Sequence, residues 1–558
     1  MYLLLNALWL IWMAKYILFW LYLWQLKDYH IGRFVDHFRT HKGKQLIFNF
    51  VQIFKLILLI LFLVSGDALG AIFIYLFFIL FLVYSEGSIS FLIGIFKKSI
   101  KKPIRTLKTL FLVGIFSIII ALFLYEISKI NGPFYPVLLL GFDILTPIIV
   151  SVIVLLLQPF FVMIRNNTLR KAGSKIEKVK LLSGLKVVAI TGSYGKTSTK
   201  EFLSTILSKK FKVLSTKEHQ NSELGIAKCI LEDLKPSHQI FIAEVGAYNR
   251  GKVKEVCSIL KPKIGIVTGI NEQHLALFGS LENLLSAEGG RELAEFLPKD
   301  GTLVINGDNK YCLDLYKRAY AKRYLNKKIY SLSNKIVNSD IWADGIEIHE
   351  DHVSFLVVDG SRGITKTSYG TEIPNLEMAH FSVSVLGKQN IQNLLGAILI
   401  ARELGMSLEE ISEACKHIFQ KQAGMTLKHE NHGINIVDSS YSANPDGVFA
   451  DLDYLSIFNG KKVIVMPCLI ELGEKSSEIH EKIGRKIGKV CDLVIITSKD
   501  KFKEIEKGFN ETKQEGVRCL LCDNPRDICS TITLFCKTGD TVLLEGRVPV
   551  KLISLLLE

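Results

Sequence analysis

Five long apolar stretches occupy the first 164 residues of this 558-residue chain and limit what this part can fold into. Crossing the hydrocarbon core of a bilayer takes about 20 mainly apolar residues. The stretches 3 to 25, 46 to 66, 68 to 95, 109 to 126 and 135 to 164 meet that requirement. A cleaved signal peptide would have a shorter apolar run behind a basic segment, and it would not be followed by four more spans. We therefore predict a polytopic transmembrane domain over residues 1–165.

Basic residues are concentrated in alternate connections between these stretches. The first and third connections and the segment after residue 164 are rich in Lys and Arg, whereas the second and fourth connections carry almost none. Because short basic loops stay in the cytoplasm, five spans predict an N-terminus outside and residues 165–558 in the cytoplasm. The basic residues next to the spans would face anionic membrane lipids. They account for the net charge of +14, so we expect no nucleic-acid binding.

The ten cysteines all lie in the part of the chain beyond the apolar stretches, at irregular spacing. This pattern is typical of free thiols in a reducing compartment. Cys519 and Cys522 form a single CxxC pair. Without a second pair at metal-ligand spacing, a zinc or redox role is the weaker interpretation.

A short apolar run, Val187 to Thr191, leads directly into a glycine-interrupted loop that ends in Gly195-Lys196-Thr197. In a loop of this kind the backbone N–H groups face nucleotide phosphates, the lysine reaches the terminal ones, and the threonine hydroxyl binds Mg²⁺. The helix that follows adds its positive end. The loop is shorter than the commonest phosphate loop, because only two residues separate its glycines. It predicts binding of ATP and Mg²⁺ by Gly192, Ser193, Gly195, Lys196, Thr197 and Ser198.

Beyond Leu185, short β-branched runs alternate with helical patterns. The candidate strands are residues 187–191, 239–245, 264–268 and 302–306, and such alternation favours a mostly parallel sheet covered on both faces. Residues 329–384 are β-rich, and a second alternation begins near Gly433. We therefore predict an α-helical membrane domain followed by α/β structure: a basic linker over 166–184, a P-loop ATP-binding domain with a parallel sheet over 185–420, and a Rossmann-like C-terminal domain over 421–558.

Six motifs follow one another at compatible spacing after residue 185. Besides the phosphate loop they are Asn221 to Gly225, Ala243 to Ala247, Gln273 to Ser280, Asn306 to Asn309, Gly387 to Asn393, and Asp438 to Pro445. In this order the chain, from about Leu185 to Leu557, resembles the Mur ligases, the ATP-dependent amide ligases of peptidoglycan precursor synthesis. It is most similar to the MurF type, which adds D-alanyl-D-alanine to a UDP-muramoyl tripeptide.

The resemblance implies an ADP-forming acid–amino acid ligase that joins a carboxylate to an amine through an acyl phosphate. The expected partners are a muramoyl-peptide precursor, UDP- or lipid-linked, and an amine such as D-alanyl-D-alanine. The ligase must neutralise the transferred phosphate and stabilise the tetrahedral intermediate. Lys196, Glu244 and His274 are the candidate catalytic residues.

Glu244 ends a strand beside the phosphate loop, where its carboxylate is well placed as a hard oxygen ligand for Mg²⁺. The resemblance implies that His274 helps to hold a second Mg²⁺, although a single histidine at a strand end is more often structural. The family pattern also implies nucleotide contacts for Asn306, Asn390 and Asp438. Taken singly, such residues are more often found in turns and caps.

Two local departures from the family bear on the site. Many Mur ligases carry a lysine, modified to a carbamate that helps to bind Mg²⁺, in the stretch that corresponds to residues 285–291, and this chain has no lysine there. Glu288 could supply the missing carboxylate, or it could be a solvated helix residue. Near the start of the C-terminal domain the family has Gly-Arg, with the arginine directed at phosphate, whereas this chain has Gly424-Met425.

The largest departure lies at the N-terminus, where the MurF type has a small soluble domain that holds the UDP end of its substrate. Five membrane spans occupy that place here. The acceptor could therefore be membrane-linked, or the anchor could place the ligase beside membrane enzymes of the same pathway. Polar side chains of the first basic connection could bind a diphosphate head group or form a solvated turn; they are Asp28, His30, Arg33, Asp36, His37 and Arg39.

Three alternative functions remain. A polyglutamate-type or other acid–amino acid ligase also combines membrane spans with a Mur-like core, but the complete 438–445 motif favours the first interpretation. A P-loop transport ATPase should carry ionisable residues within its spans. The few in these stretches are expected mostly near span ends: Lys15, Lys55, Asp67, Glu86 and Asp143. An inactive scaffold should have lost Lys196, Thr197 or Glu244, and all three are present.

Overall fold

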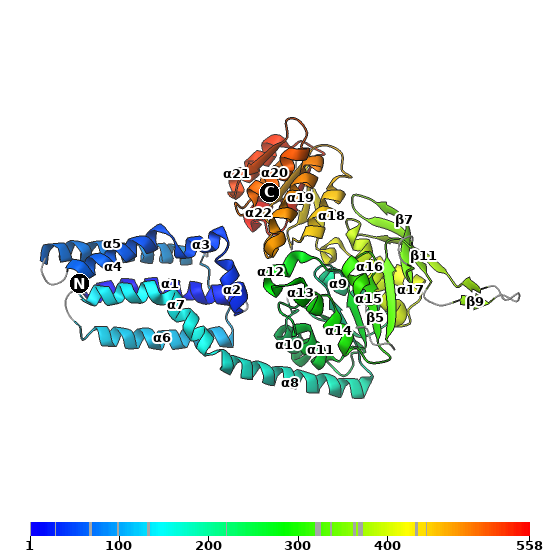
Figure 1. The fold of residues 1–558 in the computed structure, drawn as a ribbon, viewed down its shortest axis with the longest axis horizontal. Helices are drawn as coiled ribbons and strands as arrows, with labels where there is room; N and C mark the ends of the chain where they lie inside the picture. Colours follow the sequence, from blue (N-terminus) through cyan, green and yellow to red (C-terminus); the bar gives the residue numbers. More distant parts are fainter. Residues whose placement is uncertain are drawn as a thin grey trace. The chain divides into compact units, whose positions relative to one another are not determined.

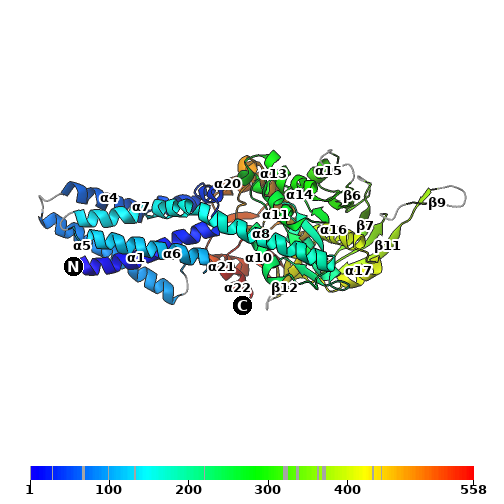
Figure 2. The same cartoon turned by 90° about the horizontal axis from the view of Figure 1, so that it is seen from below.

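The computed structural model of the chain divides into two compact units, residues 1–166 and 167–558, and each is described by itself. It describes residues 2–27, 29–65, 70–97, 100–130, 134–218, 220–317, 325–334, 338–360, 364–366, 372–429, 433–441 and 443–557. Asp28, Asp67 and Ser442, which belong to the predicted loops and motifs, lie outside these ranges. Figures 1 and 2 show the two units from two directions.

The first unit is built from helices alone in its described residues. They are α1 (Tyr2–Leu26), α2 (Ile31–His37), α3 (His41–Ile47), α4 (Phe50–Ser65), α5 (Gly70–Phe96), α6 (Leu107–Ile127) and α7 (Phe134–Leu156). Helix α1 packs against α5, α6 and α7, and α4 packs against α5 and α7 (Figure 2). Among the described residues five segments are long and apolar enough to cross a membrane: Tyr2–Leu26, Gly43–Val64, Ile72–Phe96, Leu107–Ile127 and Phe134–Leu156. These agree with the five predicted stretches.

The last apolar stretch is shorter than the predicted 135 to 164. Helix α7 ends at Leu156, and a new helix, α8 (Gln158–Ser183), starts two residues later. Pro159, in the first turn of α8, explains the break because proline has no N–H to donate and is tolerated at the start of a helix but not in its interior. The segment 166–184, predicted as a linker, therefore falls almost entirely within α8.

The prediction that ionisable residues lie mostly near span ends is wrong, because Lys15, Lys55, Glu86 and Asp143 all lie well inside their apolar segments. Asp143 lies near the middle of α7 and Lys55 within α4, and both side chains are fully buried. Lys55 Nζ donates to Asp143 Oδ2 at 2.5 Å, while Tyr84 and Trp12 each donate to the same carboxylate at 3.1 Å. The sequence alone does not show which helix faces meet, so the pairing of these two charges inside the bundle was missed.

The second unit contains a nine-stranded sheet in the order β11-β8-β7-β6-β5-β4-β1-β3-β2. The strands are β1 (Lys186–Thr191), β2 (Val213–Ser215), β3 (Ile240–Glu244), β4 (Ile264–Val267), β5 (Thr302–Asn306), β6 (Asn326–Ser331), β7 (Ile341–Ile348), β8 (Val353–Asp359) and β11 (Glu377–Val383), with β9 (Ile364–Lys366) and β10 (Glu372–Pro374) paired separately. All pairings from β2 to β7 are parallel, and β7, β8 and β11 are antiparallel. The predicted mostly parallel sheet is confirmed.

Helices cover both faces of this sheet because its central strands are apolar on both sides. Val188 and Ile190 of β1 face one hydrophobic core, and Val187 and Ala189 face the other. The first core is closed by α9, α16 and α17, and the second by α10, α11, α14 and the second half of α8. The helices are α9 (Lys196–Leu207), α10 (Glu223–Asp233), α11 (Lys252–Leu260), η2 (Glu272–His274), α12 (Leu275–Phe278), α13 (Leu281–Ala287), α14 (Arg291–Phe296), α15 (Lys310–Lys317), α16 (Gln389–Glu403), α17 (Leu408–Cys415) and η3 (Gln420–Ala423).

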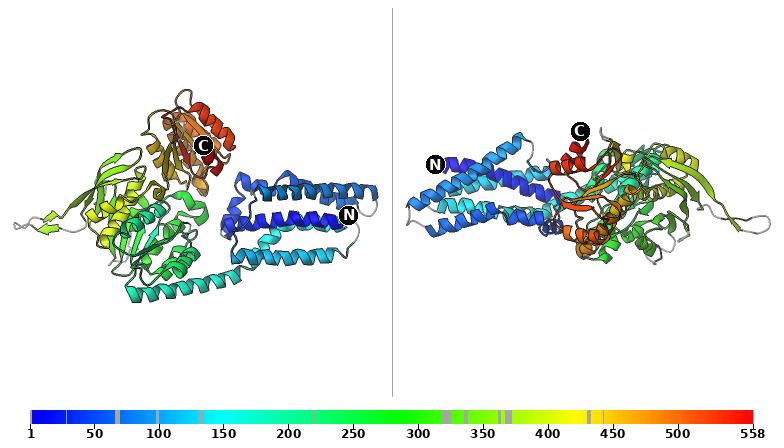
Figure 3. Two further views of the ribbon diagram at one scale, coloured as in Figure 1. Left: turned by 180° about the vertical axis from the view of Figure 1, so that it is seen from behind. Right: turned by 90° about the horizontal axis from the view of Figure 1, so that it is seen from above.

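A six-stranded sheet follows in the order β12-β13-β17-β14-β15-β16, and it is parallel except for β12. Its strands are β12 (Thr426–His429), β13 (Asn435–Ser439), β14 (Lys462–Met466), β15 (Leu493–Ile496), β16 (Arg518–Leu521) and β17 (Thr541–Glu545). Its helices are α18 (Pro445–Leu455), η4 (Gly473–Lys475), α19 (Ser476–Val490), α20 (Phe502–Thr512), α21 (Pro525–Phe535) and α22 (Val550–Leu557), orange to red in Figure 3. The predicted Rossmann-like alternation is confirmed.

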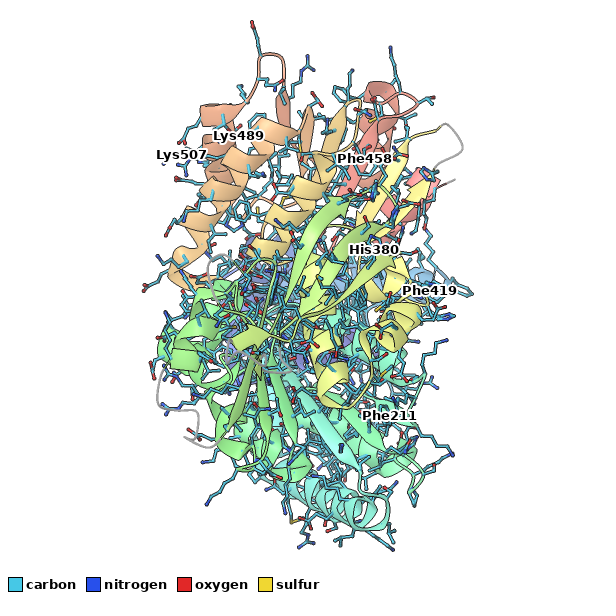
Figure 4. All side chains as sticks on the ribbon, turned by 90° about the vertical axis from the view of Figure 1, so that its right-hand side faces the viewer. Phe211, His380, Phe419, Phe458, Lys489 and Lys507 are labelled. Atoms are coloured by element: carbon cyan, nitrogen blue, oxygen red, sulfur yellow. The ribbon has the colours of Figure 1, made fainter. Side chains whose placement is uncertain are left out.

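Helices α19 and α20 approach each other closely because glycines line their contact. A Cβ on Gly484 would lie 2.1 Å from the Ile505 carbonyl oxygen, and one on Gly508 would lie 2.0 Å from the Glu481 carbonyl oxygen. Charged side chains such as Lys489 and Lys507 remain on the outer surface of the pair (Figure 4). The boundary predicted at 420/421 stays a prediction, since the two sheets show only that it falls between β11 and β12.

Candidate functional site

The phosphate loop connects β1 to α9, and its two glycines adopt backbone conformations that other residues disfavour. Gly192 has φ +139° and Gly195 has φ +75°. A Cβ on Gly192 would lie 2.4 Å from Thr268 Oγ1, and one on Gly195 would lie 2.4 Å from Asn393 Oδ1. Glycine is therefore required at both positions, and the loop is pressed against the end of β4 and the start of α16.

The predicted lysine lies inside this loop. Lys196 Nζ donates to the carbonyl oxygens of Gly192 and, at 3.1 Å, of Ser193. The Ser193 N–H donates to the Gly269 carbonyl at 2.7 Å, which ties the loop to the segment after β4. Because Lys196 is also the first residue of α9, its charge and the positive end of the helix act at the same place.

Glu244, at the end of β3, is the carboxylate next to Thr197. Its Oε2 accepts a hydrogen bond from Thr197 Oγ1 at 3.1 Å, and its Oε1 accepts one from Asn221 Nδ2 at 3.1 Å. Lys200 Nζ, fully buried one helical turn after Lys196, lies 3.4 Å from Glu244 Oε2 and 3.1 Å from Glu201 Oε1. These contacts fix the carboxylate toward the threonine hydroxyl.

His274 and Glu288 form a second polar pair beside the loop. His274 Nδ1 lies 2.9 Å from Glu288 Oε1, and Ser193 Oγ donates to Glu288 Oε2 at 2.8 Å. Burial alone would raise the pKa of Glu288, but His274, Lys196 and the Ser193 hydroxyl together hold that pKa below its usual value. Glu288 is only 1% exposed, so the alternative of a solvated helix residue is wrong.

The predicted asparagines are buried and bonded to the protein. Asn306 Nδ2 donates to the Thr268 carbonyl at 2.7 Å, and its Oδ1 accepts from the Asp308 N–H at 2.9 Å. Asn390 donates to the Leu386 carbonyl at 2.8 Å and accepts from Asn393 Nδ2 at 3.2 Å. Their side-chain amides are thus held by hydrogen bonds within the protein, near the phosphate loop. A direct contact with the nucleotide stays a prediction for each.

The C-terminal sheet presents its own polar loop to the same region. Asn271 Nδ2 donates to Asn444 Oδ1 at 3.0 Å and to Asp446 Oδ2 at 2.8 Å, and Gln273 Nε2 donates to the Ala443 carbonyl at 3.1 Å. The ANP part of the 438–445 motif thus binds the segment that precedes His274.

Two further residues of this domain were singled out in the sequence. Asp438 accepts hydrogen bonds from Ser440 Oγ at 2.6 Å and Lys428 Nζ at 3.1 Å, and its nucleotide contact stays a prediction. Met425 is 2% exposed and belongs to the hydrophobic core of the C-terminal sheet. Tyr441 lies nearer the phosphate loop: burial, and after it the charge of Glu244, raises its pKa.

Sequence reasoning missed several of these residues. Lys200 could have been predicted from the sequence, because it follows Lys196 by one helical turn and therefore lies on the same side of α9. Asn271 and Asp446 could not have been predicted, because their contact joins two domains that are far apart in the sequence.

The site fits Mg²⁺ at Thr197 and Glu244. Adjacent ligands of an octahedral Mg²⁺ lie about 3 Å apart, and Thr197 Oγ1 and Glu244 Oε2 are 3.1 Å apart. The described residues contain no group of three or more His, Cys, Asp or Glu side chains arranged around one metal. Mg²⁺ in nucleotide sites commonly uses one or two carboxylates plus substrate phosphates, so a single protein carboxylate here is sufficient.

Family comparisons match both sheets of the second unit. The Mur ligase middle domain matches residues 190–401, and the Mur ligase glutamate ligase domain matches residues 425–548. Together the two matches cover more than half of the chain. The chain belongs to the Mur ligase family.

Curated relatives of this Mur ligase are named UDP-N-acetylmuramoyl-tripeptide–D-alanyl-D-alanine ligase. The protein of Escherichia coli (strain K12) is 29% identical over 303 residues, 54% of this chain and 61% of the relative. That of Mycobacterium leprae (strain TN) is 26% identical over 398 residues, 68% of this chain and 74% of the relative. The chain spans about three fifths of the length of the first curated relatives it matches.

Solved structures show the same fold. MurF from Acinetobacter baumannii has a TM-score of 0.60 at 23% identity, covering 70% of this chain and 80% of that one. MurF ligase from Thermotoga maritima, solved in complex with ADP, has a TM-score of 0.56 at 23% identity, covering 70% of this chain and 83% of that one.

Proposed function

We propose that this Mur ligase is an ATP-dependent, ADP-forming amide ligase that adds D-alanyl-D-alanine, or a similar amine, to a muramoyl-peptide precursor at the membrane. The names of its relatives support the reaction. The observation that carries the proposal is the convergence of Lys196, Thr197–Glu244 and His274–Glu288 on one phosphate loop. That convergence supplies the charges required by phosphoryl transfer to a carboxylate.

The loop would bind the ATP phosphates through its backbone N–H groups, and Lys196 would neutralise charge on the γ-phosphoryl group during transfer. The acceptor carboxylate attacks the γ-phosphorus and releases ADP. The amine then attacks the resulting acyl phosphate, and phosphate leaves as the amide forms. Lys196 and the α9 N-terminus would stabilise the negative charge that develops in both steps.

Thr197 and Glu244 would hold a Mg²⁺ ion, which would supply Lewis-acid stabilisation of the phosphates when bound. Asn221 and Lys200 keep the Glu244 carboxylate turned toward Thr197. Glu288 and His274 would form the second cation site. Glu288 would provide there the carboxylate that many family members obtain from a modified lysine, and its burial beside Ser193 supports that role.

The membrane segments suggest where the acceptor comes from. Residues 1–166 stand outside both family matches and contain five helices apolar enough to cross a membrane. We propose that the acceptor is lipid-linked or that the anchor holds the ligase beside membrane enzymes of the same pathway. In either case the ligase domains would lie in the cytoplasm, near anionic lipids.

The test is ADP release by the full chain in detergent, with ATP, Mg²⁺, D-alanyl-D-alanine and either a UDP-linked or a lipid-linked muramoyl peptide. Mass spectrometry of the products should show a gain of one D-alanyl-D-alanine unit. Faster turnover of the lipid-linked acceptor would support a membrane substrate, and equal turnover would leave only the docking role of the anchor.

The same assay separates the alternatives. ADP release with glutamate, but not with D-alanyl-D-alanine, would indicate the polyglutamate type. ADP release at the same rate with or without any amine would indicate a transport ATPase. No ADP release under any condition would indicate an inactive scaffold. The buried Lys55–Asp143 pair removes one sequence argument against transport. Family membership is the remaining argument against it.

A further inference from the structure

Glu471 has an unusual backbone conformation for a residue that is not glycine. It lies between β14 and η4, with φ +68°. L-residues rarely adopt the left-handed region, because the Cβ then crowds the backbone. Residues held there cluster at functional sites and persist only where the surrounding structure fixes them. The contacts of Glu471 are therefore informative.

Those contacts reach the ATP-binding domain at His274. The Glu471 carbonyl oxygen accepts the N–H of Ala276 at 3.1 Å. Its carboxylate Oε2 lies 3.9 Å from His274 Nε2, and the two side chains are only 14% and 17% exposed. Gly473 packs on the same turn, since a Cβ there would lie 3.4 Å from the Ala276 nitrogen.

The imidazole of His274 thus lies between two carboxylates from different domains. Glu288 of the ATP-binding domain bonds its Nδ1, and Glu471 of the C-terminal domain faces its Nε2. Asn271 and Gln273, just before His274, are bound by the 443–446 loop of the C-terminal domain. The segment 271–276 is therefore contacted by two separate loops of that domain, one on each side of His274.

We propose that Glu471 is a positioning residue through which the docked C-terminal domain fixes the orientation of His274. This inference rests on the proposed ligase function. Glu288 alone holds one edge of the imidazole, whereas Glu471 restrains the opposite edge only while the two domains are in contact. The His274 imidazole therefore has its reactive orientation only when the C-terminal domain is docked. Polar partners that orient a functional histidine typically contribute about 10–100-fold to affinity or activity.

The test compares three variants of the full chain in detergent. Glu471→Gln keeps the size of the side chain but removes its charge, and Glu471→Gly removes the side chain while relieving the backbone strain. Glu474→Gln is the matched control, because Glu474 is an exposed carboxylate in the same loop. We expect both Glu471 variants to lower kcat by about 10–100-fold with the KM for ATP within about 3-fold, while Glu474→Gln behaves as the unchanged protein.

A second measurement does not depend on turnover. Hydrogen–deuterium exchange of the peptide 270–279 reports the Ala276 N–H, which bonds to the backbone carbonyl of Glu471, and so it reports how firmly the Glu471 loop holds the turn after His274. We expect faster exchange there in Glu471→Gln than in Glu474→Gln, with the remaining exchange pattern unchanged. If the unchanged protein shows no ligase activity, the proposed function fails, and this measurement still decides the role of Glu471.

Any of three results would overturn the proposal. The first is a kcat for Glu471→Gln equal to that of Glu474→Gln. The second is identical exchange of the 270–279 peptide in these two variants. The third is full activity in Glu471→Gly, which would show that the carboxylate plays no part.

Discussion

Lys196 supplies the positive charge inside the phosphate loop. Its ammonium group lies inside the loop, bonded to the Gly192 and Ser193 carbonyl oxygens. We predict that Lys196→Ala lowers ADP release at least about 100-fold, because charge on the transferring phosphate loses its counter-ion. Lys209→Ala, on an exposed residue just beyond the end of α9, should change nothing. Activity that survives in Lys196→Ala would contradict the assignment of the phosphate site.

The sequence predicts the residues of this site unequally well. Lys196 and Glu244 were predictable because Glu244 ends a buried strand and Lys196 ends the loop that follows another, where the ends of parallel strands meet. Glu288 was left open because the sequence does not say which side of a helix end faces the core. Glu471 was missed, since its function arises only from contact with a segment far away in the chain. The local sequence pattern predicts which side chain lies at the end of a strand. It does not predict which side chains of another domain contact that end.

At the scale of elements, the Lys55–Asp143 pair joins α4 to α7 inside the helical unit. Breaking a buried ion pair leaves an uncompensated charge, and this typically destabilises a protein by about 3–5 kcal/mol. We predict a loss of this size in the free energy of unfolding for Lys55→Met or Asp143→Leu alone, measured by denaturant unfolding in detergent.

The double variant Lys55→Met/Asp143→Leu is the informative comparison. It replaces both charges with apolar side chains, so its loss should be much smaller than the sum of the single losses. Lys129→Met, on an exposed residue of the same unit paired with Glu126, should have little effect. Additive losses in the double variant would show that the two residues do not stabilise each other.

Glu545 ends β17 and lies beside Asp451 of α18. The two buried carboxyl groups interact with each other and with the Ser439 hydroxyl. Asp451 also accepts from Ser439 Oγ at 2.5 Å and from Gln389 Nε2 of α16 at 2.9 Å. Burial, and after it the charge of Asp451, raises the pKa of Glu545 well above its ordinary value. Burial also raises the pKa of Asp451. The folded protein therefore keeps a proton that the unfolded chain releases near pH 4 to 5.

A raised acid pKa gives stability that is complete below the unfolded pKa and is lost as pH rises through the folded one. Glu545→Gln is neutral at every pH, so its melting temperature relative to the unchanged protein should rise as the pH increases above the ordinary pKa of a glutamate. Glu515→Gln, at an exposed position, should show no such trend. A difference that stays constant with pH would rule out a proton held by Glu545.

Three strands escaped prediction for a common reason. β2, β12 and β16 each lie at the edge of a sheet. None is buried along its length, so none has the continuous apolar run that marked β1, β3, β4 and β5. An edge strand forms because its backbone makes hydrogen bonds to the neighbouring strand. These bonds depend little on its own side chains, so its sequence shows no clear strand pattern.

At the scale of the whole molecule, the orientation of the chain stays a prediction from its basic loops. Protease added to intact cells should remove a tag placed before Tyr2 and leave a tag placed after residue 557 untouched, because short basic loops stay in the cytoplasm. Permeabilised cells, in which both tags should be cleaved, are the control. Protection of the N-terminal tag in intact cells would refute the predicted position of the N-terminus outside the cell.

Helix α8 determines where the chain can be cut. Leu169, Ala172, Ile176 and Val179, all before the predicted start of the ATP-binding domain at residue 185, are buried in the core beside β1. A shortened chain beginning at residue 185 would expose that core to water and should aggregate, at roughly 1.5–3 kcal/mol for each large side chain lost. One beginning at residue 166 keeps these side chains. A shortened form of the Mur ligase domains for crystallisation therefore has to retain part of the segment that the sequence predicts as a linker.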